Sequence, residues 1–234
     1  MKDLRVTTLS DYRSHVLVIP IGSIESHGPL PPALDCLIAE CLAARCSIEE
    51  AVLAPPIPVS TSWEHHGLAP TISVSVDTFA KYLRELVEST SKHFRAILLL
   101  VAHGGAKPVA YAVCRELIAK GVRVAMLSIH SCIEDYLRSR GIEVEPIHAD
   151  PIEASLALAC SPTGIEGVAP ASTEIVKQIL NELKPRRPWL EPWTWRDIAE
   201  RYTVDRIPGS IELGKEILEA CCRELKRVIE ELKR

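Results

Sequence analysis

Two continuous apolar runs constrain the fold of this chain more than any other feature of its sequence. Residues 15–21 read HVLVIPI and residues 96–102 read AILLLVA. Aliphatic runs of this kind are typical of strands buried on both faces, as in a parallel sheet. The longest run has seven residues, too few to cross a membrane. The N-terminus also has no signal-peptide hydrophobic segment, so we expect a cytoplasmic protein.

Helical patterns alternate with these and further strand-like segments. Strands are expected at 15–21, 51–59, 96–102 and 122–128, with an extended stretch at 142–147. Helices are expected at 35–47, after a cap at Asp77, from Pro108 to about Gly121 and at 131–138. Two more helices are expected, one that starts within 148–151 and ends at about Cys160, and one from Ser210 onward. Residues 184–209 read as irregular. The order predicts an α/β fold, a three-layer α/β/α arrangement with a mainly parallel central sheet, in a single domain over residues 1–234.

Composition narrows the class of protein. The chain is 47% hydrophobic and 25% charged with a net charge of −4, which is ordinary for a globular protein and gives no basic surface for nucleic acid or anionic membrane. One Gln and one Asn beside 17 Pro indicate a thermophilic source. The eight cysteines form no CxxC pair, so a thiolate zinc site is not expected. Most are expected to pack as small apolar residues, and one structural disulfide stays open.

Polar residues with metal-ligand chemistry follow the predicted strands. Sites in open α/β sheets form beyond the carboxyl ends of strands. The candidates after the first strand are Glu25, His27 and Asp35; His103 follows the central strand; His148, Asp150 and Glu153 follow the stretch ending at residue 147.

The spacing of these residues suits a shared metal site. Glu25 and His27 are two residues apart, so in an extended segment both side chains point the same way. Asp35 begins a predicted helix, from which a carboxylate can bridge two cations. Imidazoles and carboxylates together suit zinc, manganese or iron. Each residue also has a structural alternative, as a loop acid, a helix cap or a backbone-bonded histidine, and Glu153 as a partner of the helix dipole.

Four segments carry a family resemblance. Residues 22–29 read GSIESHGP, followed by LP and Asp35; they resemble the opening motif of the creatininase family of metal-dependent amidohydrolases, roughly G-S-x-E-x-H-G-P-H-L-P-x-x-x-D. His103-Gly104-Gly105 resembles its second motif, N-G-H-G-G-N, and His148-Ala149 with Glu153 and Ser155 resembles its third, H-A-G-x-x-E-T-S. Ser62, His66 and residues 71–73 fall where the family has S-x-x-H and G-T-I-S segments.

This chain departs from the family pattern in several places. The family His between Pro29 and Leu30 is absent, which shortens the Glu25-to-Asp35 spacing by one residue. Val101 and Ala106 stand in place of two Asn, Asp150 and Ala154 in place of Gly and Thr, and Pro70 in place of Gly. The ligand types Glu, His, Asp, His and Glu all remain.

The resemblance implies a creatininase-like fold and a two-metal hydrolase of non-peptide C–N bonds. One divalent ion would be held by Glu25, Asp35 and His103, and the other by His27, Asp35 and Glu153, with Asp35 bridging. His148 would carry a proton to the leaving nitrogen. The remaining family contacts imply a substrate-binding role for Ser62, His66, Gly104 and Gly105, with the loop around Trp63 covering the substrate.

Several substrates are compatible with the resemblance. The family includes creatinine amidohydrolases, peptidases that trim a cofactor-precursor peptide, and archaeal deformylases of a formylaminopyrimidine ribonucleotide on the route to riboflavin and deazaflavin cofactors. The deformylases also lack the extra His and carry a His-Gly pair like His66-Gly67, so we expect a deformylase-like activity on a small molecule. Creatinine hydrolysis, precursor-peptide cleavage and a degenerate ligand-binding relative are the alternatives. We also expect a homo-oligomer, since family members assemble and residues 184–209 are rich in Trp.

Overall fold

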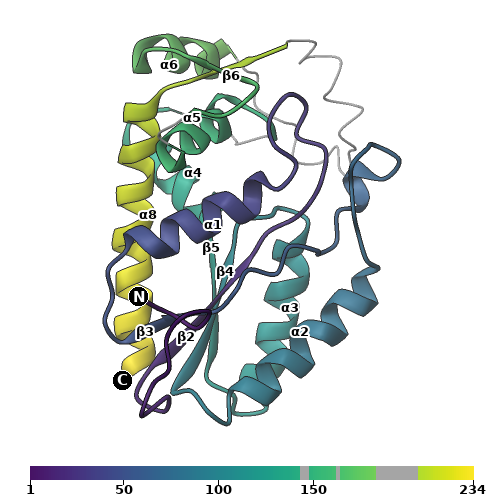
Figure 1. The fold of residues 1–234 in the computed structure, drawn as a ribbon, viewed down its shortest axis with the longest axis vertical. Coiled ribbons are helices and arrows are strands. Elements are labelled where there is room, and N and C mark those ends of the chain that lie inside the picture. The colour runs from purple at the N-terminus through teal and green to yellow at the C-terminus, as the bar shows by residue number, and fades with distance from the viewer. Residues whose placement is uncertain (143–147, 162–163, 183–204) are drawn as a thin grey trace.

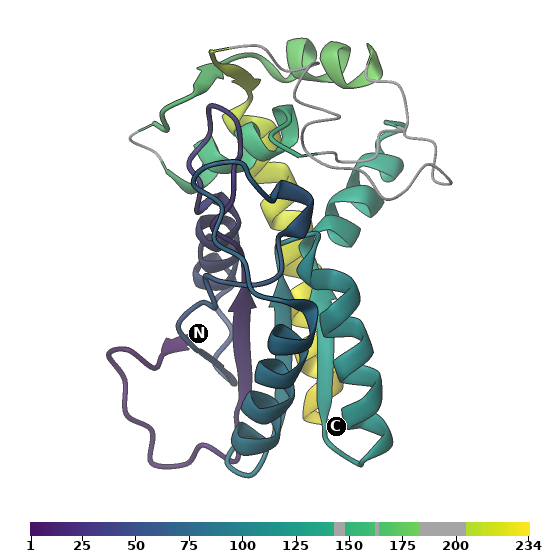
Figure 2. The same ribbon diagram turned by 90° about the vertical axis from the view of Figure 1, so that its right-hand side faces the viewer.

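The computed structural model describes residues 1–142, 148–161, 164–182 and 205–234, and in these the chain forms a five-stranded parallel sheet with helices on both faces (Figures 1 and 2). The strand order is β1-β3-β2-β4-β5. The strands are β1 (Lys2–Asp3), β2 (Val16–Ile21), β3 (Ala51–Leu53), β4 (Ala96–Val101) and β5 (Val124–Ser128). The predicted three-layer α/β/α fold with a parallel central sheet is therefore confirmed.

The two apolar runs form the centre of the sheet. β2 pairs with β4 along its whole length, with Leu17 opposite Ile97, and every residue of both strands is buried. Because successive side chains of a strand point to opposite faces, each run supplies both cores. Val16, Val18, Leu98 and Leu100 pack into one core, and Leu17, Ile19, Ile97 and Leu99 into the other.

The helices divide between these two cores. On one face lie α2 (Val76–Thr90) and α3 (Ala106–Ala119); on the other lie α1 (Leu34–Arg45), α4 (Ile129–Ser139), α5 (Pro151–Cys160) and the long α8 (Ile211–Lys233), as Figure 1 shows. A short η1 (Trp63–His65) lies between β3 and α2. Beyond the main sheet, β6 (Val168–Pro170) pairs in parallel with β7 (Ile207–Gly209), and α6 (Thr173–Glu182) lies between them in sequence.

Some predicted boundaries were wrong, for local reasons. The strand expected at 51–59 ends at Leu53, because Pro55 and Pro56 have no backbone N–H to continue the ladder. Ser75, not Asp77, caps α2: its Oγ accepts from the N–H of Thr78 at 3.2 Å. The helix expected at 131–138 begins two residues earlier, at Ile129.

Parts of two expectations lie outside the described residues. Residues 143–147 of the expected extended stretch and residues 184–204 of the expected irregular segment belong to this part of the chain. The expected homo-oligomer interface in the Trp-rich stretch depends on residues 184–204 and stays a prediction. Among the described residues, no helix is long and apolar enough to span a membrane.

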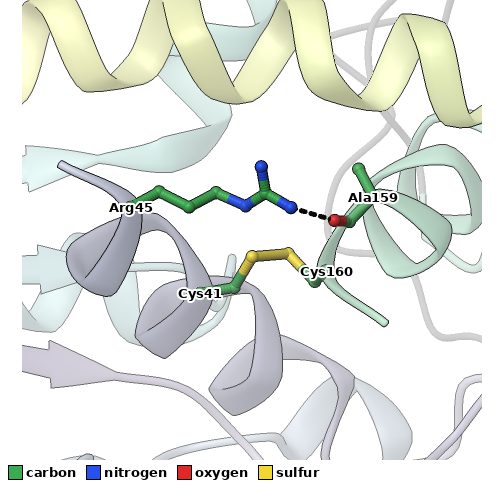
Figure 3. Close-up of a disulfide and its surroundings, with 4 residues drawn as sticks. All are labelled: Cys41, Arg45, Ala159 and Cys160. Atoms are coloured by element: carbon green, nitrogen blue, oxygen red, sulfur yellow. Dashed lines mark hydrogen bonds between the residues drawn. A yellow bond between two sulfur atoms is a disulfide. The ribbon is translucent and has the colours of Figure 1, made fainter. Parts of the chain in front are cut away.

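Two disulfides connect α1 and the residue after it to α5 and α8. Cys41 of α1 is bonded to Cys160 at the end of α5, and Cys46, which follows α1, is bonded to Cys222 of α8. Figure 3 shows the first bridge beside the hydrogen bond that Arg45 donates to the carbonyl of Ala159. From the sequence, one structural disulfide was a possibility, whereas the structure has two. The other four cysteines, Cys36, Cys114, Cys132 and Cys221, are buried and free, as expected of small apolar residues.

We predict that removing the Cys41–Cys160 bridge lowers the free energy of unfolding by about 2–4 kcal/mol, because the bridge closes a long loop in the unfolded chain. The bridged residues are 119 positions apart. The measurement is urea unfolding of a Cys41→Ala/Cys160→Ala variant. Cys114→Ala, which removes a buried free cysteine, is the control. A double variant no less stable than this control would contradict the prediction.

Candidate metal centre

Six candidate residues from distant parts of the sequence meet at the carboxyl end of the sheet. The loop after β2 supplies Glu25 and His27, and the first turn of α1 supplies Asp35. His103 comes two residues after the end of β4. His148 precedes α5 and Glu153 lies in its first turn. All six are buried, with exposed fractions of 1–7%. Burying so many ionisable groups is costly unless they are paired or bind an ion, so the cluster is a strong candidate for a functional site.

The donor atoms of this cluster form three overlapping groups, in each of which all ligand atoms lie within 4.8 Å of one another. The groups are Glu25, Asp35 and His103; His27, His148 and Glu153; and Glu25, His65 and His148. The first group has the composition that the resemblance implied for one ion. The second contains two of the three residues implied for the other ion and adds His148.

Asp35 lies between two imidazoles. Its Oδ2 is 3.1 Å from His103 Nδ1, and its Oδ1 is 3.5 Å from His27 Nε2. The hydroxyl of Ser23 donates to Oδ2 at 2.9 Å and fixes the carboxylate in this orientation. One oxygen therefore faces each candidate ion position, as a bridging carboxylate requires. The loop that is one residue shorter than the family pattern still brings Asp35 and Glu25 to the same ring nitrogen, His103 Nδ1, which lies 3.3 Å from Glu25 Oε1.

Backbone carbonyls select the ring nitrogens that face the cluster. His103 Nε2 lies 2.9 Å from the carbonyl of Thr61, and His27 Nδ1 lies 3.1 Å from the carbonyl of Glu25. A carbonyl only accepts, so these nitrogens carry the hydrogen in the neutral rings. The lone pairs of His103 Nδ1 and His27 Nε2 are then directed toward the carboxylates. Carbonyl-bonded imidazoles of this kind are the usual form of metal-ligating histidine.

Without a cation, bound protons offset the negative charge of the carboxylates in the cluster. Burial alone would raise the pKa of Glu25, but the nearby His103 outweighs it and lowers that pKa to about 2. Burial would likewise lower the pKa of His27, but Asp35 raises it to about 9. Burial raises the pKa of Glu153 to about 8. The metal-free site therefore takes up protons at neutral pH, where a bound divalent cation would replace them.

The donor set fits a divalent cation. Within the described part of the chain, Glu25 Oε2 and His27 Nε2 are buried atoms without a hydrogen-bond partner. Such orphaned atoms are rare in folded proteins and indicate a missing ligand. Three carboxylates and neutral imidazoles are the ligands that zinc, manganese and iron accept.

The start of α5 positions Glu153. Asp150 caps the helix by accepting from the N–H groups of Ile152 and Glu153 at 2.8 and 2.9 Å, and Pro151 occupies the first turn. Glu153 Oε2 accepts from the N–H of Ala149 at 2.6 Å. Ala149 has a φ of 48°, in the left-handed region that alanine rarely adopts. This turn brings His148 and Glu153 into the same donor group, with His27.

The loop at 60–66 differs in one respect from the sequence expectation. Ser62 is buried, and its Oγ is 3.3 Å from His103 Nε2. His66, expected to bind substrate, is exposed and lies against the ring of Trp63 with the centroids 4.9 Å apart. Its neighbour His65 is buried instead, with Nε2 3.4 Å from Glu25 Oε1. The S-x-x-H spacing counted from Ser62 ends at His65, so this signal was present in the sequence. A substrate contact by His66 stays a prediction.

A cavity of about 70 Å³ opens onto the cluster. Its lining comprises Glu25, Asp35, Glu64, His65, His103, Gly104, Gly105, His130, His148 and Glu153. A Cβ at Gly105 would lie 2.2 Å from Glu64 Oε1 and 2.6 Å from His103 Nε2, so only glycine fits there. Gly104 has open space where its Cβ would be. Glu64 and His130 were missed by the sequence reasoning. Among the described residues, none of the three donor groups lies in the larger surface hollow of about 540 Å³ near Tyr12 and His93.

Curated relatives match part of this chain. The mycofactocin precursor peptide peptidase of Mycolicibacterium smegmatis is 34% identical over 98 residues, which cover 38% of this chain and 40% of that protein. The 3-dehydro-scyllo-inosose hydrolase of Thermotoga maritima is 27% identical over 157 residues, 63% of this chain and 50% of that protein. The chain spans half or less of the length of these relatives.

Solved structures match almost the whole chain. A crystal structure of creatinine amidohydrolase (creatininase) aligns with a TM-score of 0.64 at 18% identity, over 93% of this chain and 90% of that one. A structure described as creatininase Mn aligns with a TM-score of 0.62 at 19% identity, over 93% and 91%. At these identities the likeness establishes the fold.

The family assignment comes from the sequence profile. The profile of the creatininase family, described as creatinine amidohydrolase, matches residues 2–229. Because this match covers nearly the full length of the sequence, the chain belongs to the creatininase family.

Proposed function

We propose that this protein hydrolyses a C–N bond of a small amide, using two divalent cations. Glu25, Asp35 and His103 would hold one ion, and His27, Asp35 and Glu153 the other. The observation that carries the proposal is the position of Asp35, with one carboxylate oxygen facing His103 and the other facing His27. Bound there, the cations would supply a nucleophilic water at neutral pH and polarise the scissile carbonyl.

The residues of the chain provide positioning and proton transfer. Ser23 holds the Asp35 carboxylate in place by a hydrogen bond of 2.9 Å. Gly104 leaves open space in the adjacent wall, so a substrate carbonyl can approach there, whereas Gly105 allows Thr61 and His103 to pack closely against the backbone. His148 donates its Nε2 hydrogen to the carbonyl of Ser26 at 2.7 Å, which directs Nδ1 toward the cluster. In this proposal that nitrogen, which carries no hydrogen in the neutral ring, takes up the proton lost by the attacking water and passes it to the leaving amine, which leaves poorly unless protonated.

The size of the cavity supports a formamide as substrate. A cavity of about 70 Å³ is far smaller than the ~300 Å³ of an ordinary ligand pocket, so only the reacting end of a substrate enters it. Formyl is the smallest acyl group. This supports a deformylase activity, with a formylaminopyrimidine ribonucleotide as the candidate taken from the resemblance. The experiment is hydrolysis of that ribonucleotide and of creatinine by the zinc-loaded and manganese-loaded protein; hydrolysis of creatinine alone would contradict the choice of substrate.

Cleavage of a precursor peptide is the second candidate. It is favoured by the 34% identity to the mycofactocin precursor peptide peptidase, although the match covers only 40% of that protein. Release of a C-terminal fragment from a peptide library, with no hydrolysis of formamides, would favour this candidate over deformylation.

We predict that Asp35→Ala releases or loosens both ions, because a bridging carboxylate binds both and screens their mutual repulsion. His27→Ala should leave the ion on Glu25 and His103 bound. Elemental analysis of each purified variant measures the stoichiometry. Asp77→Ala, an exposed acid in the first turn of α2, is the control. Retention of two ions by Asp35→Ala would refute the bridging role.

We predict that His148→Asn keeps its metal and loses turnover by about 10²–10⁴-fold, the usual cost of losing a general acid. Because His148 is a member of two of the donor groups, metal content and turnover must be measured on the same sample. Loss of an ion would identify His148 as a ligand, and unchanged turnover would exclude both roles.

We predict that the metal-free protein loses stability as the pH rises from about 7 to 9. His27 has its pKa raised to about 9 and Glu153 to about 8, so the folded chain binds more protons than the unfolded chain in this range. The contribution of both groups to the free energy of unfolding is complete at low pH and is lost as the pH rises through their folded-state pKa values. Urea unfolding of chelator-treated protein at pH 7, 8 and 9 measures the effect. The zinc-loaded protein, in which the ion replaces the protons, should show a flatter dependence; a metal-free protein that gains stability with pH would contradict the assignment.

A further inference from the structure

One wall of the cavity contains a histidine that the proposed metal site does not use. His130 lies in the first turn of α4, directly after the carboxyl end of β5, and lines the cavity together with Asp35 and Glu153. Its Nδ1 is buried and has no hydrogen-bond partner among the described residues. Leaving such an atom unpaired costs free energy, so a polar group of a ligand is the expected partner.

A lysine without a counter-charge is hydrogen-bonded to the residue that follows this histidine. Lys107, in the first turn of α3, donates from Nζ to the hydroxyl of Ser131 at 3.2 Å, and Ser131 follows His130 in the chain. Lys107 is half-buried, and within the described residues no carboxylate forms an ion pair with it. Its hydrogen-bond partner is neutral. A partly desolvated ammonium group of this kind attracts an anion.

We propose that Lys107 and His130 form an anion subsite, which binds a carboxylate or phosphate group of the substrate next to the scissile amide. This rests on the proposed amide hydrolysis and adds to it the residues that bind the anionic group of the substrate, such as the phosphate of the candidate ribonucleotide. The ammonium of Lys107 supplies the charge, and a hydrogen on His130 Nδ1 donates to an anion oxygen. Of the four acids of the cavity, Glu25, Asp35 and Glu153 are bound by the cations in this arrangement, and Glu64 Oε1 lies 3.6 Å from His103 Nε2.

The position of Lys107 and His130 in the fold explains why the anion would bind at a place separate from the cations. Lys107 and Ser131 begin the helices that follow β4 and β5, whereas Glu25, His27 and Asp35 come from the segment after β2. The anion subsite therefore lies toward the β5 edge of the sheet, since β4 and β5 are neighbours and β5 is the last strand in the order. A substrate that spans the two places its amide at the cations and its charged group at Lys107.

The first test measures anion binding without turnover. Inorganic phosphate is titrated calorimetrically into the desalted, zinc-loaded protein, with Lys107→Met, His130→Leu and Lys81→Met as variants. Lys81 is an exposed lysine of α2, and its replacement makes the same charge change away from the cavity. Loss of one charge-assisted hydrogen bond should weaken phosphate binding about tenfold in the first two variants and leave the third unchanged. Zinc content, measured on each sample, should be the same in all four proteins.

Equal phosphate affinity in all four zinc-loaded proteins would overturn the proposal, because the anion would then be bound by the cations alone. Parallel weakening in Lys81→Met would overturn it too, because the effect would then come from net charge. Neither result depends on whether the protein is a hydrolase.

The second test compares two formamides of similar size. N-formylglycine carries a carboxylate and N-formylglycinamide does not. The wild-type protein should prefer the charged compound in kcat/KM, and Lys107→Met should reduce that preference about tenfold through KM. An unchanged preference in Lys107→Met contradicts the anion subsite. If neither compound is hydrolysed by any variant, the formamide proposal fails, and the phosphate titration still decides the anion subsite.

Discussion

The buried carboxylate of Asp35 is the point on which the arrangement of the site depends. It can reach His103 and His27 together only if α1 begins directly against the end of β2. Gly22 makes this possible: a Cβ there would lie 2.6 Å from the backbone nitrogen of Cys36. Any other residue would push the helix away from the strand, and the carboxylate with it. The hydrogen bond from Ser23, the next residue, then orients Asp35. Sheet, helix and ligand are thus connected by two adjacent contacts, the close packing of Gly22 on Cys36 and the hydrogen bond from Ser23 to Asp35.

The parts of the fold that were predictable are those encoded by local patterns. Continuous apolar runs indicated β2 and β4, and 3.6-residue periodicity indicated α2 and α8, because in these segments burial decides the structure. The errors came from competition between neighbours. Ser75 and Asp77 are both good helix caps, and only the position of the first turn decides between them. The disulfides could not be paired from sequence, since Cys41 and Cys160 are 119 residues apart and meet only through the packing of α1 on α5.

The candidate site was predictable where chemistry and spacing coincide. Glu25, His27 and Asp35 come after β2 and His103 after β4, and parallel strands end at one edge, so the sequence brings these residues together. The extended stretch expected before Glu153 lies mostly outside the described residues. His65 and His66 show where this reasoning stops: adjacent residues of an irregular loop have no periodicity that tells which one points inward, and only the S-x-x-H spacing from Ser62 distinguishes His65. His130 was missed because its helix was expected to begin one residue after it, and no local pattern reveals that a ring nitrogen lacks a partner.

The two disulfides have a consequence for a chain that has been cut. Cys41 and Cys46 lie on the N-terminal side of any break between residues 46 and 160, and Cys160 and Cys222 lie on its C-terminal side. A break between residues 160 and 222 still leaves Cys46 bonded to Cys222. A protease that cleaves the backbone once anywhere between residues 46 and 222 therefore produces two fragments that stay covalently joined. Such nicked molecules would migrate as one species on a non-reducing gel, and Glu25, Asp35 and His103 would stay tethered even where the cut separates them in sequence.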